Sequence, residues 1–137
     1  MLLRISVVVG GLLAAGCGGP ISPEAAYRDY LRALARGTYA EAFDRLTAAS
    51  RAACVAAESG AKLDASDRPG LRHFRRVVSS GPPHHLPLIP EESADRVEIL
   101  VESSANDVAV LRITTPAGAV SVTLRREDGA WRIEFKL

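Results

Sequence analysis

Two cysteines and three histidines are the most reactive side chains of this 137-residue sequence. A thiol becomes a nucleophile when a base or cation lowers its pKa, and Cys54 has only Arg51 close to it in sequence. Because Cys54 lies in an alanine-rich helical stretch, we interpret it as a buried residue. Neither His73 nor the adjacent His84 and His85 has an acidic or cysteine partner at metal-ligand spacing. We therefore expect no metal site, no cofactor and no catalytic residue.

The other cysteine, Cys17, ends a segment with the layout of a secretory signal peptide. Arg4 provides a positive start, and the apolar run over residues 5–15 is too short to span a membrane. Residues 13–17 (LAAGC) resemble the lipobox of bacterial lipoproteins. This resemblance implies that residues 1–16 are cleaved off as a signal peptide and that the Cys17 sulfur receives a diacylglyceryl group.

The same resemblance implies a location in the cell. In that family the new amino terminus is usually acylated as well, and two or more acyl chains give stable membrane anchoring. Gly18 follows the cysteine, so the aspartate associated with inner-membrane retention is missing. We expect an exported protein whose lipid on Cys17 anchors it to the periplasmic face of the outer membrane, with residues 17–21 as the lipidated cysteine and tether. The alternative is ordinary secretion with an incidental Cys17.

Aromatic side chains are the first candidates for lining a ligand pocket. Tyr27, Tyr30 and Tyr39 lie on the apolar sides of two predicted helices, and Trp131 lies in a predicted strand. Buried tyrosine hydroxyls usually find a hydrogen-bond partner, so the three tyrosines are the polar groups best suited to face a cavity. Apolar residues at helical spacing more often form the core, and core packing is the interpretation that we favour.

A cluster of cations is the second candidate site. Arg72, Arg75 and Arg76 share the outer side of a short helix predicted around Leu71 and Val78. Guanidinium groups at this spacing could bind an anion such as a lipid headgroup or a peptidoglycan carboxylate. We favour the simpler interpretation of a solvated helix face. The whole chain has a formal net charge of +1, which argues against a nucleic-acid-binding protein.

The amino-terminal half is predicted to be helical. Residues 22–24 (SPE) have the composition of a helix start, and Gly37 is a typical helix end. Thr38 and Glu41 match a capping box, so a second helix is expected to begin directly after the first. A third helix is expected over residues 50–59, and a fourth precedes a proline-rich stretch.

The carboxyl-terminal half is predicted to be a four-stranded antiparallel meander. Residues 96–102 alternate between apolar and polar side chains, and a turn over residues 103–107 is expected to lead into a strand over residues 108–114. Asp128-Gly129 is typical of a two-residue hairpin turn, and residues 115–118 of a four-residue loop. These turns predict six apolar pairs: Ile113 with Val120, Leu111 with Val122, Ala109 with Leu124, Leu124 with Ile133, Val122 with Phe135, and Val120 with Leu137.

This register predicts one apolar sheet face for the helices to cover. It consists of Val97, Ile99, Val101, Ala109, Leu111, Ile113, Val120, Val122, Leu124, Trp131, Ile133, Phe135 and Leu137. On the opposite face Arg125 lies across from Arg132, an arrangement that would either bind an anion weakly or be relieved by Glu127 and Glu134. Leu100 also lies on that face and could support a homodimer.

The patterns together predict a single α+β domain over residues 22–137. With 47% hydrophobic residues, a domain of this size can bury enough surface to need no disulfide. We expect helices over about 22–79, an irregular loop over about 80–94 and strands over about 95–137.

Two segments carry a further family resemblance, SPEAAYRDYLRALARGTYAEAF from residue 22 and EDGAWRI from residue 127. They resemble small bacterial lipoproteins of unknown function with a nuclear transport factor 2-like, or cystatin-like, fold, over residues 22–60 and 95–137. The resemblance implies helices in the concavity of a curved, cone-like sheet. That superfamily includes isomerases and dehydratases with an acidic, histidine or tyrosine residue inside the cone, but no position here matches such a motif.

Three functions follow as hypotheses. The first is a membrane-anchored, non-enzymatic domain that binds a small apolar ligand or a protein partner in the cell envelope. The second is a structural or assembly lipoprotein that forms a homodimer through its open sheet face. The third, which we favour least, is an isomerase or hydratase that uses Tyr27, Tyr30 or an acid from residues 61–94.

Overall fold

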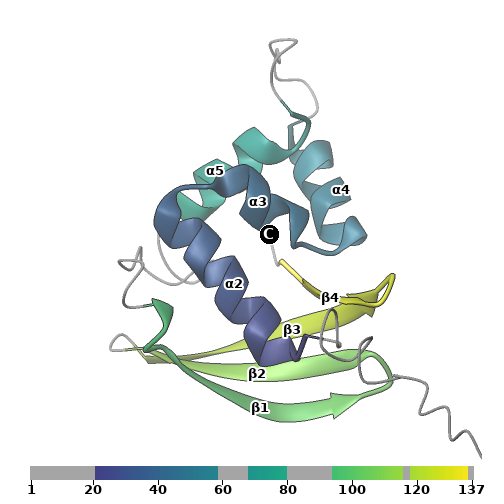
Figure 1. Cartoon of the computed structure of the whole chain (residues 1–137). Coiled ribbons are helices and arrows are strands. Elements are labelled where there is room, and N and C mark those ends of the chain that lie inside the picture. Colours follow the sequence, from purple (N-terminus) through teal and green to yellow (C-terminus); the bar gives the residue numbers. More distant parts are fainter. Residues whose placement is uncertain (1–20, 59–67, 80–93, 116–117, 136–137) are drawn as a thin grey trace, which may run out of the picture.

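The computed structural model describes residues 21–58, 68–79, 94–115 and 118–135. In these ranges the helices are α2 (Pro23–Arg36), α3 (Tyr39–Asp44), α4 (Ala48–Ala57) and α5 (Leu71–Ser79), and the strands are β1 (Glu98–Ala105), β2 (Val108–Thr115), β3 (Gly118–Glu127) and β4 (Ala130–Ile133). The strands form one open antiparallel sheet in the order β1-β2-β3-β4, which confirms the predicted α+β class and meander. Figure 1 shows α2 lying across one face of the sheet, with α3, α4 and α5 gathered beyond its carboxyl end.

Helix α2 begins and ends where its sequence predicts. The Ser22 hydroxyl oxygen accepts a hydrogen bond from the Ala25 N–H at 3.2 Å, and Pro23 occupies the first turn, where a missing N–H costs nothing. Gly37 ends the helix with φ of +75°, a conformation that glycine adopts without steric penalty. The buried side of α2 carries Tyr27, Tyr30, Leu31 and Leu34 at helical spacing.

Helix α3 begins directly after α2, as predicted, but the side chain of Thr38 does not cap it, and the start of α4 differs from the prediction. The Thr38 hydroxyl donates to the Ala33 carbonyl oxygen at 3.0 Å and does not cap α3, so the predicted capping box is wrong. Helix α4 begins at Ala48, earlier than expected, because Thr47 is the better cap: its Oγ1 accepts from the Ser50 N–H at 3.1 Å. The hydroxyl of Ser50 is then available to a distant part of the chain.

The register of β2 and β3 matches the prediction at all three apolar pairs, Ile113 with Val120, Leu111 with Val122 and Ala109 with Leu124. The turn expected over residues 103–107 is wrong. Strand β1 continues to Ala105 through an irregularity between Val101 and Ser103, and only Asn106 and Asp107 form the turn. Both have positive φ, 53° and 63°, as in the two-residue turns that fit the twist of a hairpin.

The last hairpin agrees with the prediction only in its first half. Leu124 pairs with Ile133 as expected, but β4 ends there and the predicted pair of Val122 with Phe135 does not form. Instead the Phe135 N–H donates to Ser50 Oγ at 2.9 Å, and its ring packs edge-on against Phe74 with centroids 5.3 Å apart. The pair of Val120 with Leu137 lies outside the described residues.

The free side of β4 is occupied by the connection between α3 and α4. The Ile133 N–H donates to the Arg45 carbonyl oxygen at 2.9 Å, and the Thr47 N–H donates to the Ile133 carbonyl oxygen at 2.9 Å. These two bonds form a short parallel bridge at Leu46. An open strand edge invites pairing with other chains, so this bridge protects that side of the sheet.

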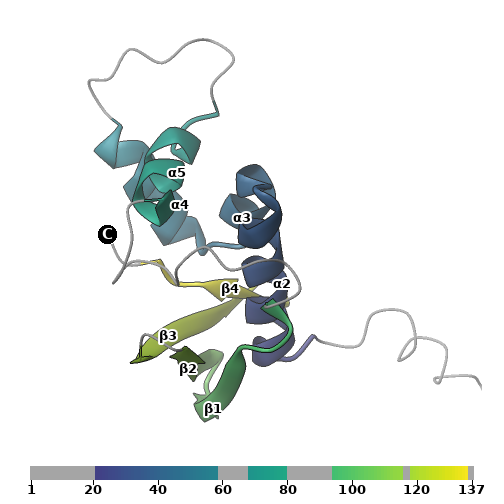
Figure 2. The same cartoon turned by 90° about the vertical axis from the view of Figure 1, so that its left-hand side faces the viewer.

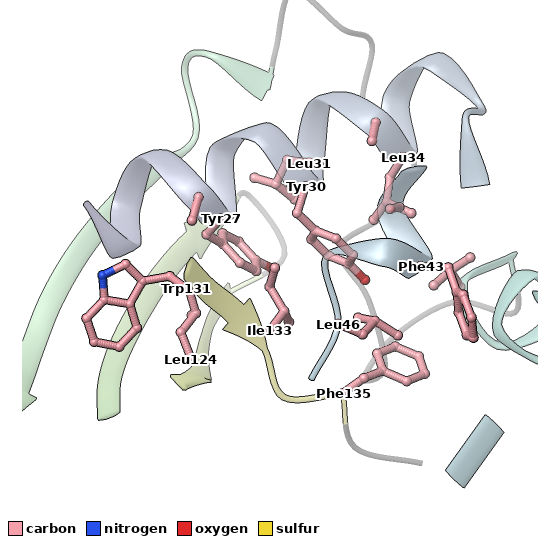
Figure 3. Packing of buried hydrophobic residues seen from close by; sticks show 14 of the residues in the cluster. Tyr27, Tyr30, Leu31, Leu34, Phe43, Leu46, Leu124, Trp131, Ile133 and Phe135 are labelled. Atoms are coloured by element: carbon pink, nitrogen blue, oxygen red, sulfur yellow. The ribbon is translucent and has the colours of Figure 1, made fainter. Parts of the chain in front are cut away.

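The hydrophobic core lies between α2, the sheet and the remaining helices (Figure 3). Most of the predicted apolar face is buried there, whereas Val97, Ile99, Val101 and Val122 are partly buried. Val120 is 38% exposed, contrary to the prediction, because β4 ends before it can lie beside this part of β3. Leu137 lies outside the described residues.

Candidate functional site

Three of the four candidate pocket residues lie in the core. Tyr27 and Tyr30 are each 4% exposed and Trp131 is 9% exposed. The two tyrosine rings are tilted against each other with centroids 5.6 Å apart. Figure 3 shows them directed from α2 toward Ile133 and Leu46. These three residues therefore pack in the hydrophobic core, which is the interpretation that we favoured from the sequence.

The fourth candidate, Tyr39, lies apart from them at the start of α3. It is only partly buried, at the margin of the core. Nine residues of α2 follow Tyr27 before the helix ends, a rise of about 14 Å at 1.5 Å per residue. The Arg75 guanidinium carbon lies 5.3 Å from the centroid of the Tyr39 ring, within the range of a cation–π contact. Tyr39 therefore belongs with the arginines of α5.

Burial keeps the phenols and the thiol of the core protonated. Burial raises the pKa of Tyr27, and burial together with the neighbouring Tyr27 and Cys54 raises the pKa of Tyr30. Burial, followed by the charge of Glu58, raises the pKa of the Cys54 thiol to about 11. Cys54 is completely buried, as predicted, and its thiol lacks the activation that nucleophilic catalysis requires.

The arginines of α5 point outward, as the sequence indicates. Arg72, Arg75 and Arg76 are exposed, whereas Phe74 and Val78 on the other side of the helix are buried. We call the exposed face made by Tyr39, Arg72, Arg75 and Arg76 the Tyr39–arginine surface. It combines residues of α3 and α5, two helices that contact each other.

The surroundings of this surface are strongly basic. We use the term helical lobe for residues 48–58 and 68–79, which comprise α4, α5 and the residues next to them (Figure 2). The helical lobe contains five arginines and one acid, Glu58. The remaining described residues carry nine arginines and eleven acids. Among the residues that the structure describes, positive charge is therefore concentrated in the helical lobe.

The single acid of the helical lobe is used inside the fold. Glu58 is 7% exposed, and its two carboxylate oxygens accept hydrogen bonds from the N–H groups of Gly70 at 2.7 Å and His73 at 2.6 Å. These N–H groups lie at the start of α5, where a helix has unpaired donors and a partial positive charge. Sequence reasoning missed this contact because the partners are 12 and 15 residues away from Glu58.

Asp44, at the end of α3, is a second meeting point of charges. Its carboxylate pairs with Arg68, and its carbonyl oxygen accepts from Arg132 Nη1 at 2.6 Å. The hydrogen bond from Arg68, with the charges of Arg68, Arg51 and Arg132, lowers the pKa of Asp44. The guanidinium of Arg68 also lies 5.2 Å from the Phe43 ring centroid. Both the carboxylate and the carbonyl oxygen of Asp44 are therefore paired with arginines of the same chain.

The predicted repulsion between Arg125 and Arg132 is relieved, though not entirely as expected. The two residues do face each other across the strands, and Arg125 Nε lies 3.3 Å from Glu134 Oε1. Glu127 does not take part, because its Oε1 accepts from the Ala48 N–H at 2.9 Å at the start of α4. Arg132 instead turns to the carbonyl of Asp44.

Sequence reasoning also missed a cation on the apolar sheet face. Arg126 pairs with Trp131 across the strands, and its guanidinium carbon lies 4.7 Å from the indole centroid. The backbone N–H of Arg126 donates to the Asp107 carbonyl oxygen at 2.8 Å. The alternation of side chains along β3 could have predicted this position, because residues 124 and 126 of a strand must lie on the same face.

The remaining predicted site residues add no ligand cluster. His73 contributes its backbone N–H to Glu58, while Cys17, His84 and His85 lie outside the described residues. In the part of the chain that the structure describes, no group of three or more histidine, cysteine, aspartate or glutamate side chains is placed to hold a metal ion. None of its helices is both long and apolar enough to cross a membrane.

Comparison with known proteins adds no assignment. No protein-family model matches the sequence, and no curated protein and no solved structure matches the chain. The functional interpretation therefore depends on the chemistry of the residues themselves. Among the described residues, the Tyr39–arginine surface has the composition most suited to binding, since it joins exposed guanidinium groups to an aromatic ring.

Proposed function

We propose that this chain is an exported lipoprotein, held by lipid on Cys17 at the periplasmic face of the outer membrane. The observation that carries this proposal is the position of the LAAGC segment relative to the fold. Helix α2 has its cap at Ser22, five residues after Cys17. Five extended residues reach roughly 18 Å. A lipid on Cys17 would therefore hold the folded domain close to the membrane surface.

The domain is proposed to act by binding rather than by catalysis. Tyr and Arg are the residue types that most often dominate protein interfaces, and both occur on the Tyr39–arginine surface. The buried aromatic residues Tyr27 and Trp131 are part of the packed core, which favours a protein partner in the envelope over a small apolar ligand held inside the fold.

The proposed family type is the nuclear transport factor 2-like, cystatin-like α+β domain. Its support is the placement of α2 across one face of a four-stranded antiparallel meander (Figure 1). The irregularity in β1 between Val101 and Ser103 adds to this support, because a bulge increases the local twist and bend of a strand.

A second candidate function is a structural lipoprotein that forms a homodimer through the outer sheet face. The observation in its favour is Leu100, which lies on that face and is 57% exposed. Val108 and Val110 lie on the same face and are partly buried. An exposed leucine beside two valines offers an apolar contact for a second copy.

The mass of the mature protein tests the proposed anchoring. We expect the full chain, produced in a bacterium, to lose residues 1–16 and to gain a diacylglyceryl group and an amide-linked acyl chain on Cys17. The Cys17→Ser variant should lack both additions and should no longer sediment with membranes. A mature chain with an unmodified Cys17 would overturn the proposal.

A further inference from the structure

We infer that the Tyr39–arginine surface binds an acidic, carboxylate-bearing segment of a partner protein. This inference names the partner class of the proposed binding function. Only the orientation of the Tyr39–arginine surface relative to the membrane rests on the proposed anchoring.

The first step is that this surface presents cations in a defined arrangement. Arg72, Arg75 and Arg76 occupy positions i, i+3 and i+4 of α5, which places them on one side of the helix within about 6 Å along its axis. The contact with the Tyr39 ring restricts the Arg75 guanidinium before any partner binds. A guanidinium forms two parallel hydrogen bonds with a carboxylate, and less entropy is lost when it is already ordered.

The second step is that the nearby acids within the described part of the chain are committed to other contacts. Glu58 is bound to the start of α5, and Asp44 is paired with Arg68. Glu41 lies 3.4 Å from Arg45. The described residues 48–58 and 68–79 of the helical lobe therefore carry an excess of positive charge that an acidic partner would complement.

The third step concerns the choice between a protein and a lipid surface. Figures 1 and 2 both show α5 at the end of the molecule opposite the start of α2. An anchor that joins the domain at Ser22 would therefore turn α5 away from the membrane. The Tyr39 ring is only partly buried and lies against Arg75 in this surface, and an aromatic contact of this kind favours a protein chain over a simple polyanion.

The test is a binding titration of the mature chain with a fluorescent, glutamate-rich peptide, with the glutamine-rich peptide of the same length as its reference. The double variant Arg75→Gln/Arg76→Gln is compared with Arg96→Gln/Arg112→Gln, which removes the same charge from exposed arginines near β1 and on β2. We expect the first pair to weaken binding by about tenfold, the effect of about 1.4 kcal/mol. The second pair should change it by less than about twofold, and Tyr39→Ala should weaken it as well.

Equal weakening by the two double variants would overturn the inference, because binding would then reflect net charge alone. Stronger binding to vesicles of anionic phospholipid, lost in the same Arg75→Gln/Arg76→Gln variant, would assign the surface to lipid instead. Circular dichroism of each variant confirms that it is folded. The titration is repeated on the Cys17→Ser variant, so that a failure of lipidation and a failure of peptide binding remain separate results.

Discussion

The Glu58 carboxylate accepts a hydrogen bond from the backbone N–H of Gly70, with 2.7 Å between Oε2 and the nitrogen. Its other oxygen accepts from the N–H of His73, so one side chain at the end of α4 satisfies two donors at the start of α5. Since Glu58 is buried, water cannot replace this contact easily. The junction of α4 and α5, and with it the Tyr39–arginine surface, depends on one carboxylate.

Glu58→Gln is expected to lower the free energy of unfolding by about 1–3 kcal/mol. The NH₂ group of glutamine is a donor, so one of the two backbone N–H groups at the start of α5 would lose its acceptor. Chemical denaturation measures this loss. Glu102→Gln, at an exposed position of β1, is the control and should change stability by less than about 0.5 kcal/mol. Equal stabilities of the two variants would show that the Glu58 contact contributes little.

Gly70→Ala is expected to destabilise the protein more than Gly129→Ala. Both glycines have positive φ, +87° and +78°, so both substitutions carry a similar backbone cost. At Gly70 a Cβ would also lie 2.9 Å from Phe43 Cζ, whereas at Gly129 it would meet nothing within 4 Å. We expect an additional loss of about 1–3 kcal/mol for Gly70→Ala in thermal or chemical unfolding. A difference close to zero would mean that Phe43 moves aside without cost.

Cys54 is expected to react slowly with alkylating reagents in the folded protein. Its pKa is raised from 9.0 to about 11, so at pH 8 the thiolate fraction is about a hundredfold smaller than in the unfolded chain. The measurement is the alkylation rate of the Cys17→Ser variant with and without denaturant. Comparable rates would contradict the burial of this thiol.

The same pKa shift predicts how stability depends on pH. The unfolded chain releases the Cys54 proton near pH 9 and the folded protein only near pH 11. The folded state therefore binds more protons between these values, and the free energy of unfolding falls as the pH rises through this interval. Cys54→Ala should remove this part of the pH dependence in denaturation curves recorded from pH 8 to pH 10.5.

Leu100→Lys tests the outer sheet face. For a dimer formed through this face, we expect the native chain to be dimeric and the variant monomeric in light scattering, because the lysine charge would be buried at the contact. Val55→Lys, at a position on α4 that is 43% exposed, is the control and should leave the dimer intact. A Leu100→Lys protein that remains dimeric excludes this face.

The sheet shows how far local sequence patterns can determine a fold. Period-two alternation and Asp128-Gly129 predict the pairing of Leu124 with Ile133 and the register of β2 with β3 correctly. The prediction is wrong at the turn after β1, where Asn106 and Asp107 adopt positive φ and an irregularity in the strand alters the count. The position of such an irregularity depends on backbone conformation, which cannot be predicted from the alternation of apolar and polar residues.

The remaining errors arise where distant residues decide the structure. Phe135 leaves the sheet because Ser50 offers an acceptor and Phe74 a ring, both far away in the sequence. Thr38 fails as a cap because its side chain is turned back toward the Ala33 carbonyl oxygen of the preceding helix. Of the candidate site, the exposure of the α5 arginines could be predicted from spacing, whereas the contact of Arg75 with Tyr39 depends on how α3 packs against α5.

The parallel bridge at Leu46 also has a consequence for the order of folding. Ile133 pairs with β3 on one side and with residues 45–47 on the other, so the link between α3 and α4 is completed by a residue that lies far away in the sequence. Contacts of such long sequence separation form late, because closing a long loop costs entropy before the contact stabilises anything. During synthesis the helices are therefore made well before β4 can join them. A chain truncated before Ile133 would leave Leu124 of β3 and residues 45–47 without this partner.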